Sequence, residues 1–149
     1  MRAVLQRVSR AEVRAGGRAA GAIARGLVAL IGVERGDALH DAQYLAAKIS
    51  GLRVWQDESG RMSRGLAEIG GGVLAISQFT LLGDLRRGLR PSWDQAAPAE
   101  VAEPLYEACL AALRATGLPL ACGVFGAHME LELVNDGPVT ILLDSRRQF

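Results

Sequence analysis

The chain has 149 residues, of which half are apolar and 22% are charged, and its formal net charge is +1. These values are typical of one soluble globular domain over residues 1–149, and they exclude an intrinsically disordered chain. The near-neutral charge argues against broad nonspecific nucleic-acid binding, although it leaves local basic patches open. No apolar run approaches the ~20 residues that span a bilayer, so we expect no membrane partner.

Charge interrupts the first residues at once, which is unlike a secretion signal and favours a strand. Cys109 and Cys122 lie far apart in the sequence and form no C-x-x-C pair. We therefore expect both thiols to be reduced and buried, in a cytoplasmic protein.

Alternating apolar and polar residues predict a long first strand over residues 4–14, with Arg7 in an apolar neighbourhood. Ala15-Gly16-Gly17-Arg18 is typical of a hairpin turn, after which residues 19–24 return as a short strand. The apolar run over residues 26–33 predicts a buried strand.

A helix is predicted over residues 38–51, because apolar residues recur there near helical spacing and Asp37 can supply the N-cap. Residues 52–55 favour a strand that ends at the turn 57–60. Residues 62–72 show no regular pattern, and we expect them to be irregular.

The apolar run over residues 73–76 follows three glycines and predicts another buried strand. It leads directly into Ser77, Gln78, Phe79 and Thr80. Polar groups at the end of a buried strand need partners, because an unpaired one costs about 1–3 kcal/mol. Two interpretations stay open: the partners come from neighbouring loops, or a substrate supplies them.

Residues 82–97 show no periodicity, and an irregular loop of this length is more often functional, or a lid, than idle. A second helix is predicted over residues 98–116, with Gly117 as its stop. Three further strands are expected at residues 120–124, 129–134 and 139–143.

Asn135-Asp136-Gly137-Pro138 joins the last two predicted strands and is typical of a turn. The tail Asp144–Phe149 is expected to fray. About eight strands and two main helices are therefore expected, which indicates the α/β class.

Side chains for common hydrolytic chemistry are few. The sequence has no G-x-S-x-G, no G-x-x-x-x-G-K and no H-E-x-x-H motif. His40 and His128 are the only imidazoles, and neither lies in a motif that supports a Ser-His-Asp triad or a zinc site. An enzyme of this sequence is expected to work without a metal or cofactor, and without a side-chain general base.

Two motifs are specific when they are taken together. Ser77-Gln78-Phe79-Thr80-Leu81 and Asn135-Asp136-Gly137-Pro138-Val139-Thr140, in this order, closely resemble the two signature motifs of the D-aminoacyl-tRNA deacylase family. Residues 4–8, 88–92 and 123–129 are also similar to that family. The resemblance implies a single three-layer α/β domain with a mixed, barrel-like sheet and two main helices.

The resemblance also implies an esterase that releases free tRNA and free D-amino acid from D-aminoacyl-tRNA, with no cofactor. Glycyl-tRNA, including glycine misacylated on tRNA(Ala), would be a substrate too, since glycine has no side chain to reject. The family works as a homodimer, in which a cis Gly137-Pro138 segment of one subunit would reach the pocket of the other. Its carbonyls would bind the substrate ammonium and occupy the space that an L-side chain needs.

The resemblance assigns catalysis to Ser77, Gln78, Phe79 and Thr80. Main-chain N–H groups around Phe79 and Thr80 would form an oxyanion hole, and Ser77 and Gln78 would fix the loop and contact the terminal nucleotide. Thr80 is the obvious nucleophile, but no adjacent base activates it. We therefore favour attack by water assisted by the ribose 2′-hydroxyl, with Thr80 in a positioning role.

Substrate binding and chiral selection are assigned to Arg7, to Gly137 and Pro138, and to the pocket residues Phe125, Gly126, Ala127 and Met129. Arg7 would hold the Gly-Pro segment, although an ordinary salt bridge on a strand is the alternative. Phe125 and Met129 would pack on the 3′-terminal adenosine of tRNA, or would otherwise be core residues.

Arg86, Arg87 and Arg90 either meet tRNA phosphates or belong to an exposed, solvated loop. Two alternative functions also stay open: a related tRNA-editing deacylase with relaxed chirality, and a noncatalytic RNA-binding module. The intact motifs argue against the first alternative, and the near-neutral charge argues against the second. We expect RNA and not DNA as the nucleic-acid partner.

Overall fold

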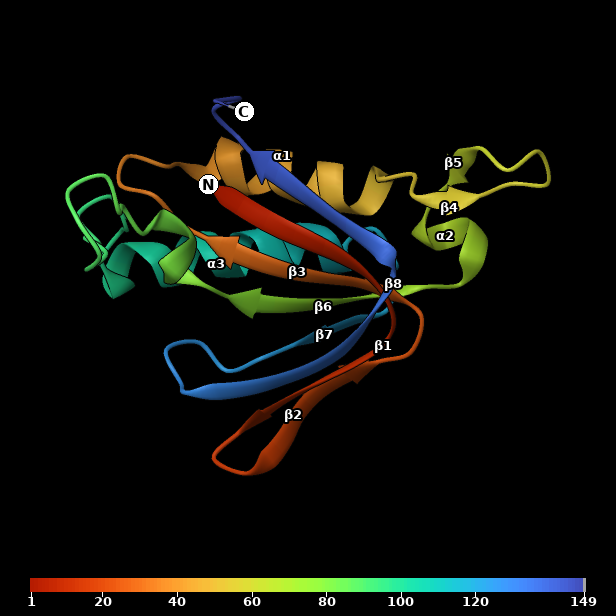
Figure 1. Cartoon of the computed structure of the whole chain (residues 1–149), viewed down its shortest axis with the longest axis horizontal. Coiled ribbons are helices and arrows are strands. Elements are labelled where there is room, and N and C mark those ends of the chain that lie inside the picture. Colours follow the sequence, from red (N-terminus) through yellow and green to blue (C-terminus); the bar gives the residue numbers. More distant parts are fainter. Residues whose placement is uncertain (149) are drawn as a thin grey trace.

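The computed structural model describes residues 1–148 (Figure 1). Eight strands and four helical segments occur within them. The strands are β1 (Arg2–Ala15), β2 (Arg18–Ile23), β3 (Gly26–Gly32), β4 (Trp55–Gln56), β5 (Met62–Arg64), β6 (Gly72–Ser77), β7 (Leu120–Cys122) and β8 (Met129–Asp144). The helical segments are α1 (Leu39–Gly51), α2 (Leu66–Ile69), the 3-10 helix η1 (Phe79–Leu82) and α3 (Ala99–Arg114). None of the helices in residues 1–148 has the length and apolar character needed to cross a membrane.

One six-stranded sheet organises the molecule. Its order is β2-β1-β3-β6-β7, and β8 pairs with the other edge of β1, while β4 and β5 form a separate ribbon. β1 pairs first with β3, over Arg2–Val8, and then with β2, over Ala11–Ala15. The sheet therefore continues around one long, bent strand, which gives it the barrel-like form seen in Figure 1.

β3 and β6 are parallel neighbours with nearly continuous apolar sequences, and both are buried as the sequence predicts. At their first residues, a Cβ on Gly26 would overlap the carbonyl oxygen of Gly72. Only glycine permits so close an approach of two main chains. The two strands then run side by side until Ile31 lies opposite Ser77, where the polar motif begins.

Two clusters of buried side chains cover the two faces of this sheet. α1 and α3 pack on one face, with Leu45, Ile49 and Leu110 in the larger cluster (Figure 1). On the other face, Leu74 and Ile76 pack against the curled part of the sheet formed by β2 and the first halves of β7 and β8. The expected α/β class, barrel-like sheet and two main helices are therefore confirmed.

The segment Asn135–Pro138 does not reverse the chain, so the prediction of two strands joined by a turn is wrong. β8 is one strand, and both of its halves pair with β1. Between the pairs Val8–Asn135 and Gln6–Thr140, β1 advances by two residues and β8 by five. The turn-forming residues therefore make a bulge, because β1 holds the chain in the same direction on both sides of it.

The tail is held in place from Asp144 to Arg147, so the prediction that it frays is wrong for these residues, while Phe149 lies outside the described part of the chain. The N–H of Ser145 donates to the carbonyl of Met1 at 2.9 Å, and Arg146 pairs with Glu34 and Asp37 at 3.5 and 2.9 Å. The sequence shows no trace of these contacts, because the partners lie more than a hundred residues away.

Three smaller predictions also need correction. Asp37 does not cap α1; the carboxylate of Asp41 does, by accepting a hydrogen bond from the N–H of Ala38 at 2.8 Å. The segment 62–72 is partly regular, since β5 and α2 lie in it. Cys109 is buried as expected, whereas Cys122 is only half-buried.

Candidate functional site

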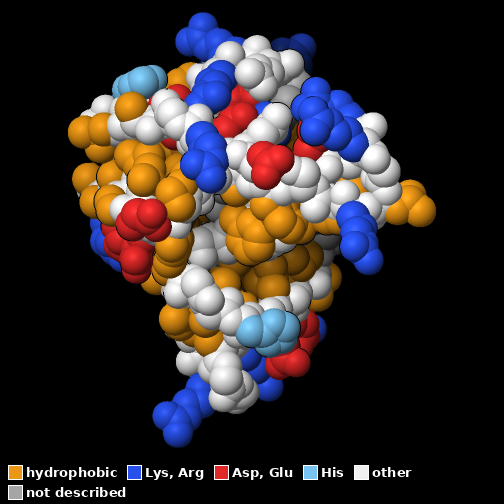
Figure 2. Space-filling view, turned by 90° about the vertical axis from the view of Figure 1, so that its left-hand side faces the viewer, with side chains coloured by type: hydrophobic (Ala, Val, Ile, Leu, Met, Phe, Trp, Pro, Cys, Tyr) orange, Lys and Arg blue, Asp and Glu red, His pale blue; other side chains and the backbone are white. Residues whose placement is uncertain are grey.

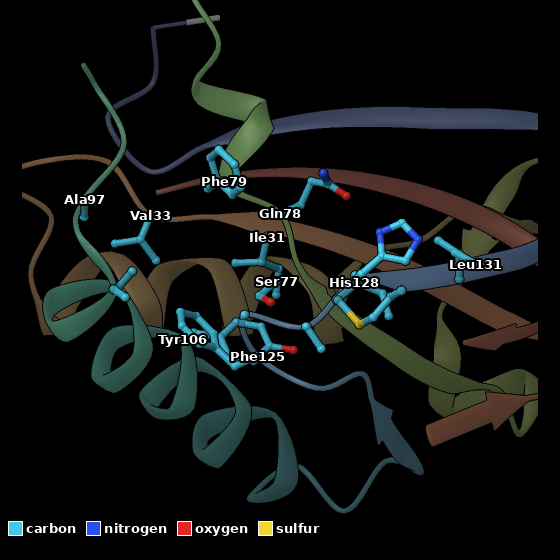
Figure 3. Close-up of a pocket in the computed structure, with 16 residues that line it drawn as sticks. Ile31, Val33, Ser77, Gln78, Phe79, Ala97, Tyr106, Phe125, His128 and Leu131 are labelled. Carbon is cyan, nitrogen blue, oxygen red and sulfur yellow. The ribbon is translucent and has the colours of Figure 1, made fainter. Parts of the chain in front are cut away.

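A cavity of about 450 Å³ opens where β3 and β6 end, between the N-terminal half of α3 and the loop that follows β7. Figure 2 shows apolar side chains gathered in a hollow on this face, and Figure 3 shows the lining residues. The lining residues are Ile31, Val33, Ile76, Ser77, Gln78, Phe79, Ala97, Ala99, Ala102, Tyr106, Phe125, Gly126, Ala127, His128, Met129 and Leu131.

The first wall of the cavity is the segment Ser77–Phe79. The N–H of Gln78 donates to the carbonyl of Ile31 at 2.7 Å, which ties this segment to the end of β3. η1 begins at Phe79, and the N–H of Leu81 makes its first bond, to the carbonyl of Gln78 at 3.4 Å. Amide groups that precede the first bond of a helix have no partner in that helix. The N–H groups of Phe79 and Thr80 therefore have no partner within η1.

The side chain of Thr80 is turned to its neighbour and not to the cavity. Its hydroxyl accepts a hydrogen bond from the Nε2 of Gln78, and Thr80 does not line the cavity. Thr80 thus fixes the amide of Gln78, and Gln78 itself faces the cavity (Figure 3).

Phe79 connects this wall to the long loop over residues 82–97. Phe79 is 57% exposed, and its ring meets Trp93 edge to face, with the ring centroids 5.2 Å apart and an interplanar angle of 73°. A Cβ on Gly83 would lie 2.8 Å from the Trp93 ring, so glycine at that position makes room for the indole. The loop is therefore packed onto the site.

The second wall is the loop Phe125–Met129. The N–H of Ala127 donates to the carbonyl of Val124 at 3.2 Å, which closes a tight turn in which Gly126 has φ +71°. The sulfur of Met129 accepts a hydrogen bond from the N–H of Val124 at 3.4 Å. Both Phe125 and Met129 are half-buried and line the cavity, so they are exposed to a ligand as well as packed on the core.

Tyr106 supports the second wall from α3. Its ring centroid lies 5.9 Å from that of Phe125, and its hydroxyl donates to the carbonyl of Ala75 at 3.1 Å. Burial raises the pKa of Tyr106 well above its usual value. The phenol is therefore neutral at physiological pH and acts as a fixed hydrogen-bond donor.

A second cluster forms around the bulge of β8. The Nε of Arg7 donates to the carbonyl of Asp136 at 2.8 Å and lies 3.3 Å from its carboxylate. The guanidinium also donates to the carbonyl of Val54. On the other side of the bulge, the side-chain oxygen of Asn135 accepts from the N–H of Val139 at 2.8 Å. The bulge is thus held from both ends.

Gly137 and Pro138 lie at the exposed tip of this bulge. The peptide bond between them is cis, and Gly137 has φ +143°. A Cβ on Gly137 would lie 2.7 Å from Cγ2 of Val139, so the conformation requires glycine. Neither residue lines the cavity of its own chain.

The structure therefore divides the predicted site residues into two groups. Seven of them surround one cavity: Ser77, Gln78, Phe79, Phe125, Gly126, Ala127 and Met129. Thr80 lies next to that group, whereas Arg7, Gly137 and Pro138 belong to the bulge cluster. Within residues 1–148, no three His, Cys, Asp or Glu side chains are grouped so that they could hold a metal ion.

Sequence reasoning missed Tyr106 and the role of His128 as a lining residue. Tyr106 could have been noticed as a polar aromatic on the buried side of α3. For His128 the signal was its position next to Ala127 and Met129, which the resemblance had already assigned to the pocket.

The family model described as D-Tyr-tRNA(Tyr) deacylase matches residues 4–144. The chain is 58% identical to the D-aminoacyl-tRNA deacylase of Anaeromyxobacter dehalogenans over 149 residues, which is the full length of both chains. It is 53% identical to the D-aminoacyl-tRNA deacylase of Thermus aquaticus, over 97% of this chain and 95% of that one.

Two solved structures share the fold of this chain. The c-Myc DNA unwinding element binding protein superposes with a TM-score of 0.89 at 40% identity, over 97% of this chain and 98% of that one. A probable eukaryotic D-amino acid tRNA deacylase has the same fold, with a TM-score of 0.81 at 15% identity, over 95% of this chain and 97% of that one. The expectation of an aminoacyl-tRNA ester hydrolase is thereby confirmed at the level of the family. The chain belongs to the D-aminoacyl-tRNA deacylase family, as the two sequence motifs predict.

Proposed function

We propose that the protein hydrolyses the ester bond between a D-amino acid and the 3′-terminal adenosine of tRNA, as a proofreading enzyme of the cytoplasm. The observation that carries this proposal is the cavity itself, in which the Ser77–Phe79 wall faces the Phe125–Met129 wall. These walls come from stretches that lie far apart in the sequence and that both resemble the family.

The Phe125–Met129 wall suits an adenine. Proteins commonly hold an unpaired RNA base against an aromatic ring and apolar side chains. Phe125 and Met129 offer both, and Tyr106 keeps the Phe125 ring in place. Bound in this way, the adenosine would present its ribose hydroxyls, and the ester on one of them, to the opposite wall.

The Ser77–Phe79 wall suits the ester carbonyl. Main-chain N–H groups of Phe79 and Thr80 would stabilise the negative oxygen that develops when the carbonyl carbon is attacked. Water is the nucleophile and the ribose 2′-hydroxyl assists the proton transfer. The ester C–O bond then breaks, and the proton passes to the released ribose oxygen. The side chain of Thr80 acts only by holding Gln78, because its hydroxyl is engaged with that amide.

The bulge of a second copy of the chain would discriminate between D- and L-aminoacyl esters. Gly137 and Pro138 are exposed, rigidly held through Arg7 and Asn135, and outside the cavity of their own chain. In a homodimer, the Gly137-Pro138 segment of one subunit would cover the mouth of the other subunit's cavity. Its carbonyls would bind the substrate ammonium and exclude an L-side chain, while glycine would still be accepted, including on tRNA(Ala).

The test is the rate of ester loss from D-tyrosyl-, L-tyrosyl- and glycyl-tRNA, measured with the unmodified protein. We expect hydrolysis of the D-ester and the glycyl ester and no hydrolysis of the L-ester. Equal rates on the D- and L-esters would favour a related editing deacylase with relaxed chirality. Retained tRNA binding without hydrolysis of any ester would favour an RNA-binding module. A monomer of full activity in solution would contradict the role given to the second subunit.

A further inference from the structure

The loop that packs onto the site through Trp93 forms a short arm, defined here as residues Asp84–Asp94. Its two ends are joined by a pair of main-chain hydrogen bonds between Asp84 and Ser92, both of 2.9 Å. The guanidinium of Arg35 also donates to the carbonyl of Asp94 at 2.8 Å. The arm is therefore fixed at its base and projects from the same end of the molecule as the cavity (Figure 1).

The three arginines of the arm are not equivalent. Arg86 is clamped by Asp84, whose carboxylate accepts a hydrogen bond from the Nε of Arg86 at 2.9 Å and another from its Nη2 at 2.6 Å. The same carboxylate accepts from the N–H of Arg86 at 2.9 Å, and these bonds lower the pKa of Asp84 to about 2. Arg86 is thus neutralised by an internal partner at every physiological pH, and its role is to shape the arm.

Arg87 and Arg90 have no such partner. Neither side chain makes a hydrogen bond or ion pair with any residue in the range 1–148, and both are exposed at the tip of the arm. Leu89, between them, is 99% exposed. Two free guanidiniums on a fixed arm offer a localised positive charge, although the whole chain carries only +1.

The position of the arm indicates which ligand its positive charge can contact. Trp93, at its base, contacts Phe79, and Phe79 lines the cavity in which the ester would be bound. Figure 2 shows basic side chains along the rim above the hollow. When the terminal adenosine of a tRNA fills the cavity, the rest of the acceptor end must extend across this face. Its backbone carries one negative charge per nucleotide.

We propose that Arg87 and Arg90 bind phosphates of the tRNA acceptor end, while Arg86 does not. This inference rests on the proposed function, since it places the terminal adenosine in the cavity. Contacts to phosphates hold a nucleic acid in register without reading its sequence. The arm therefore contributes to the affinity for every tRNA and leaves the choice of amino acid to the cavity.

The experiment compares Arg87→Gln/Arg90→Gln with Arg53→Gln/Arg61→Gln. The control removes the same charge from two exposed arginines near β4 and β5, at the opposite end of the molecule (Figure 1). For D-tyrosyl-tRNA we expect the arm variant to raise KM about 10-fold with kcat within twofold, and the control to leave both unchanged. The slope of log kcat/KM against log salt concentration should become shallower by about 1.5, which is the value for two lost phosphate contacts.

A second substrate separates phosphate binding from a structural role. D-tyrosyl-adenosine fills the cavity but carries no acceptor-end phosphates, so the arm variant should hydrolyse it at the unmodified rate. An equal loss of activity on this substrate would overturn the inference, as would an unchanged KM and salt slope for the tRNA. A similar rise of KM in the control variant would also overturn it.

A failure of the proposed function can be distinguished from a failure of this inference about the arm. If the unmodified protein hydrolyses no aminoacyl-tRNA, that function is wrong, and the arm is then tested by the direct binding of uncharged tRNA. The arm variant should still bind about 10-fold more weakly than the control. An equal weakening towards a DNA hairpin of the acceptor-stem sequence would mean that the arm binds any duplex, which overturns the assignment to tRNA.

Discussion

The Nε of Arg7 donates a hydrogen bond of 2.8 Å to the carbonyl oxygen of Asp136, a residue 129 positions later in the chain. The same guanidinium donates to the carbonyl of Val54, so one side chain joins β1, the bulge of β8 and the segment before β4. Only 13% of the Arg7 side chain is exposed. Because a buried, charged donor is costly without acceptors, Arg7 and the bulge fix each other.

Replacement of Arg7 by lysine should loosen the bulge without removing the charge. Lysine cannot reproduce the rigid fork of donors that a guanidinium offers. Loss of one charge-assisted hydrogen bond costs about 1.5–3 kcal/mol. We expect hydrolysis of L-tyrosyl-tRNA relative to D-tyrosyl-tRNA to rise at least about 10-fold, with a fall of Tm of about 3–12 °C.

Arg10→Lys is the matched control for this change. Arg10 lies on the same strand, but its ion pair with Glu132 is exposed, at 60% and 67% side-chain exposure. Exposed pairs contribute little to stability. A ratio of L- to D-hydrolysis that changes equally in both variants would show that the contacts between Arg7 and the bulge do not decide the chirality of the substrate.

Gly137→Ala tests the tip of the bulge. Alanine rarely adopts φ +143°, and its Cβ would lie 2.7 Å from Cγ2 of Val139, so the main chain must move. We expect weaker rejection of L-tyrosyl-tRNA while the D-ester is still hydrolysed. Gly51→Ala is the control, because a Cβ there meets open space. A Gly137→Ala variant that still rejects the L-ester fully would argue against any role of this segment in chirality.

Thr80→Ala should retain substantial activity, within about tenfold of the unmodified enzyme, which corresponds to about 1.4 kcal/mol in transition-state stabilisation. The hydroxyl of Thr80 holds the side chain of Gln78 and does not line the cavity. Single-turnover hydrolysis of D-tyrosyl-tRNA measures the effect, and Thr80→Ser, which keeps the hydroxyl, should be indistinguishable from the unmodified enzyme. Complete loss of activity in the alanine variant would make this hydroxyl the nucleophile.

The two thiols should differ in their reaction with a disulfide reagent at pH 8. Burial raises the pKa of Cys109 from 9.0 to about 12, so its reactive thiolate is scarce at that pH. Cys122 is half-buried and should react faster by at least about tenfold. The neutral thiol of Cys109 is the form that the fold favours, so its contribution to the free energy of unfolding should be lost as the pH rises from about 9 to about 12. Equal labelling of both thiols in the folded protein would contradict the burial of Cys109.

The buried strands could be predicted because their own sequences are enough to identify them. β3 and β6 are parallel and covered on both faces, so each carries an almost unbroken apolar run that needs no knowledge of its neighbours. The polar residues that follow β6 were equally visible as a break in that run. What the sequence left open was whether loops or a ligand satisfy them.

The meeting of the two cavity walls could not be worked out from spacing. Phe79 and Phe125 face one cavity because β6 and β7 are neighbours in the sheet, and Gly123 donates to the carbonyl of Ala75 at 3.0 Å. Strand order is a long-range property, so only the resemblance to a family indicated this pairing. Cavity residues from α3, such as Tyr106, lay outside both motifs and were missed.

The bulge of β8 was misjudged for a related reason. Residues such as Asn, Asp, Gly and Pro indicate only a local preference for a turn. The direction of the chain after Asn135–Pro138 is decided by the pairing of β8 with β1 before and after this segment. Arg146 gives a second example, since its acidic partners Glu34 and Asp37 are remote in the sequence.

β8 begins at Met129 in the Phe125–Met129 wall of the cavity and carries Gly137 and Pro138 in its middle, with no break between them. Its side chains alternate between the inside and the outside of the curved sheet, so a deletion of one residue between Met129 and Asn135 would turn every following side chain to the opposite face. The number of residues between Met129 and the bulge is therefore fixed by the pairing of β8 with β1. Substitutions along this stretch leave that spacing unchanged, whereas an insertion or deletion there would move the bulge relative to the cavity.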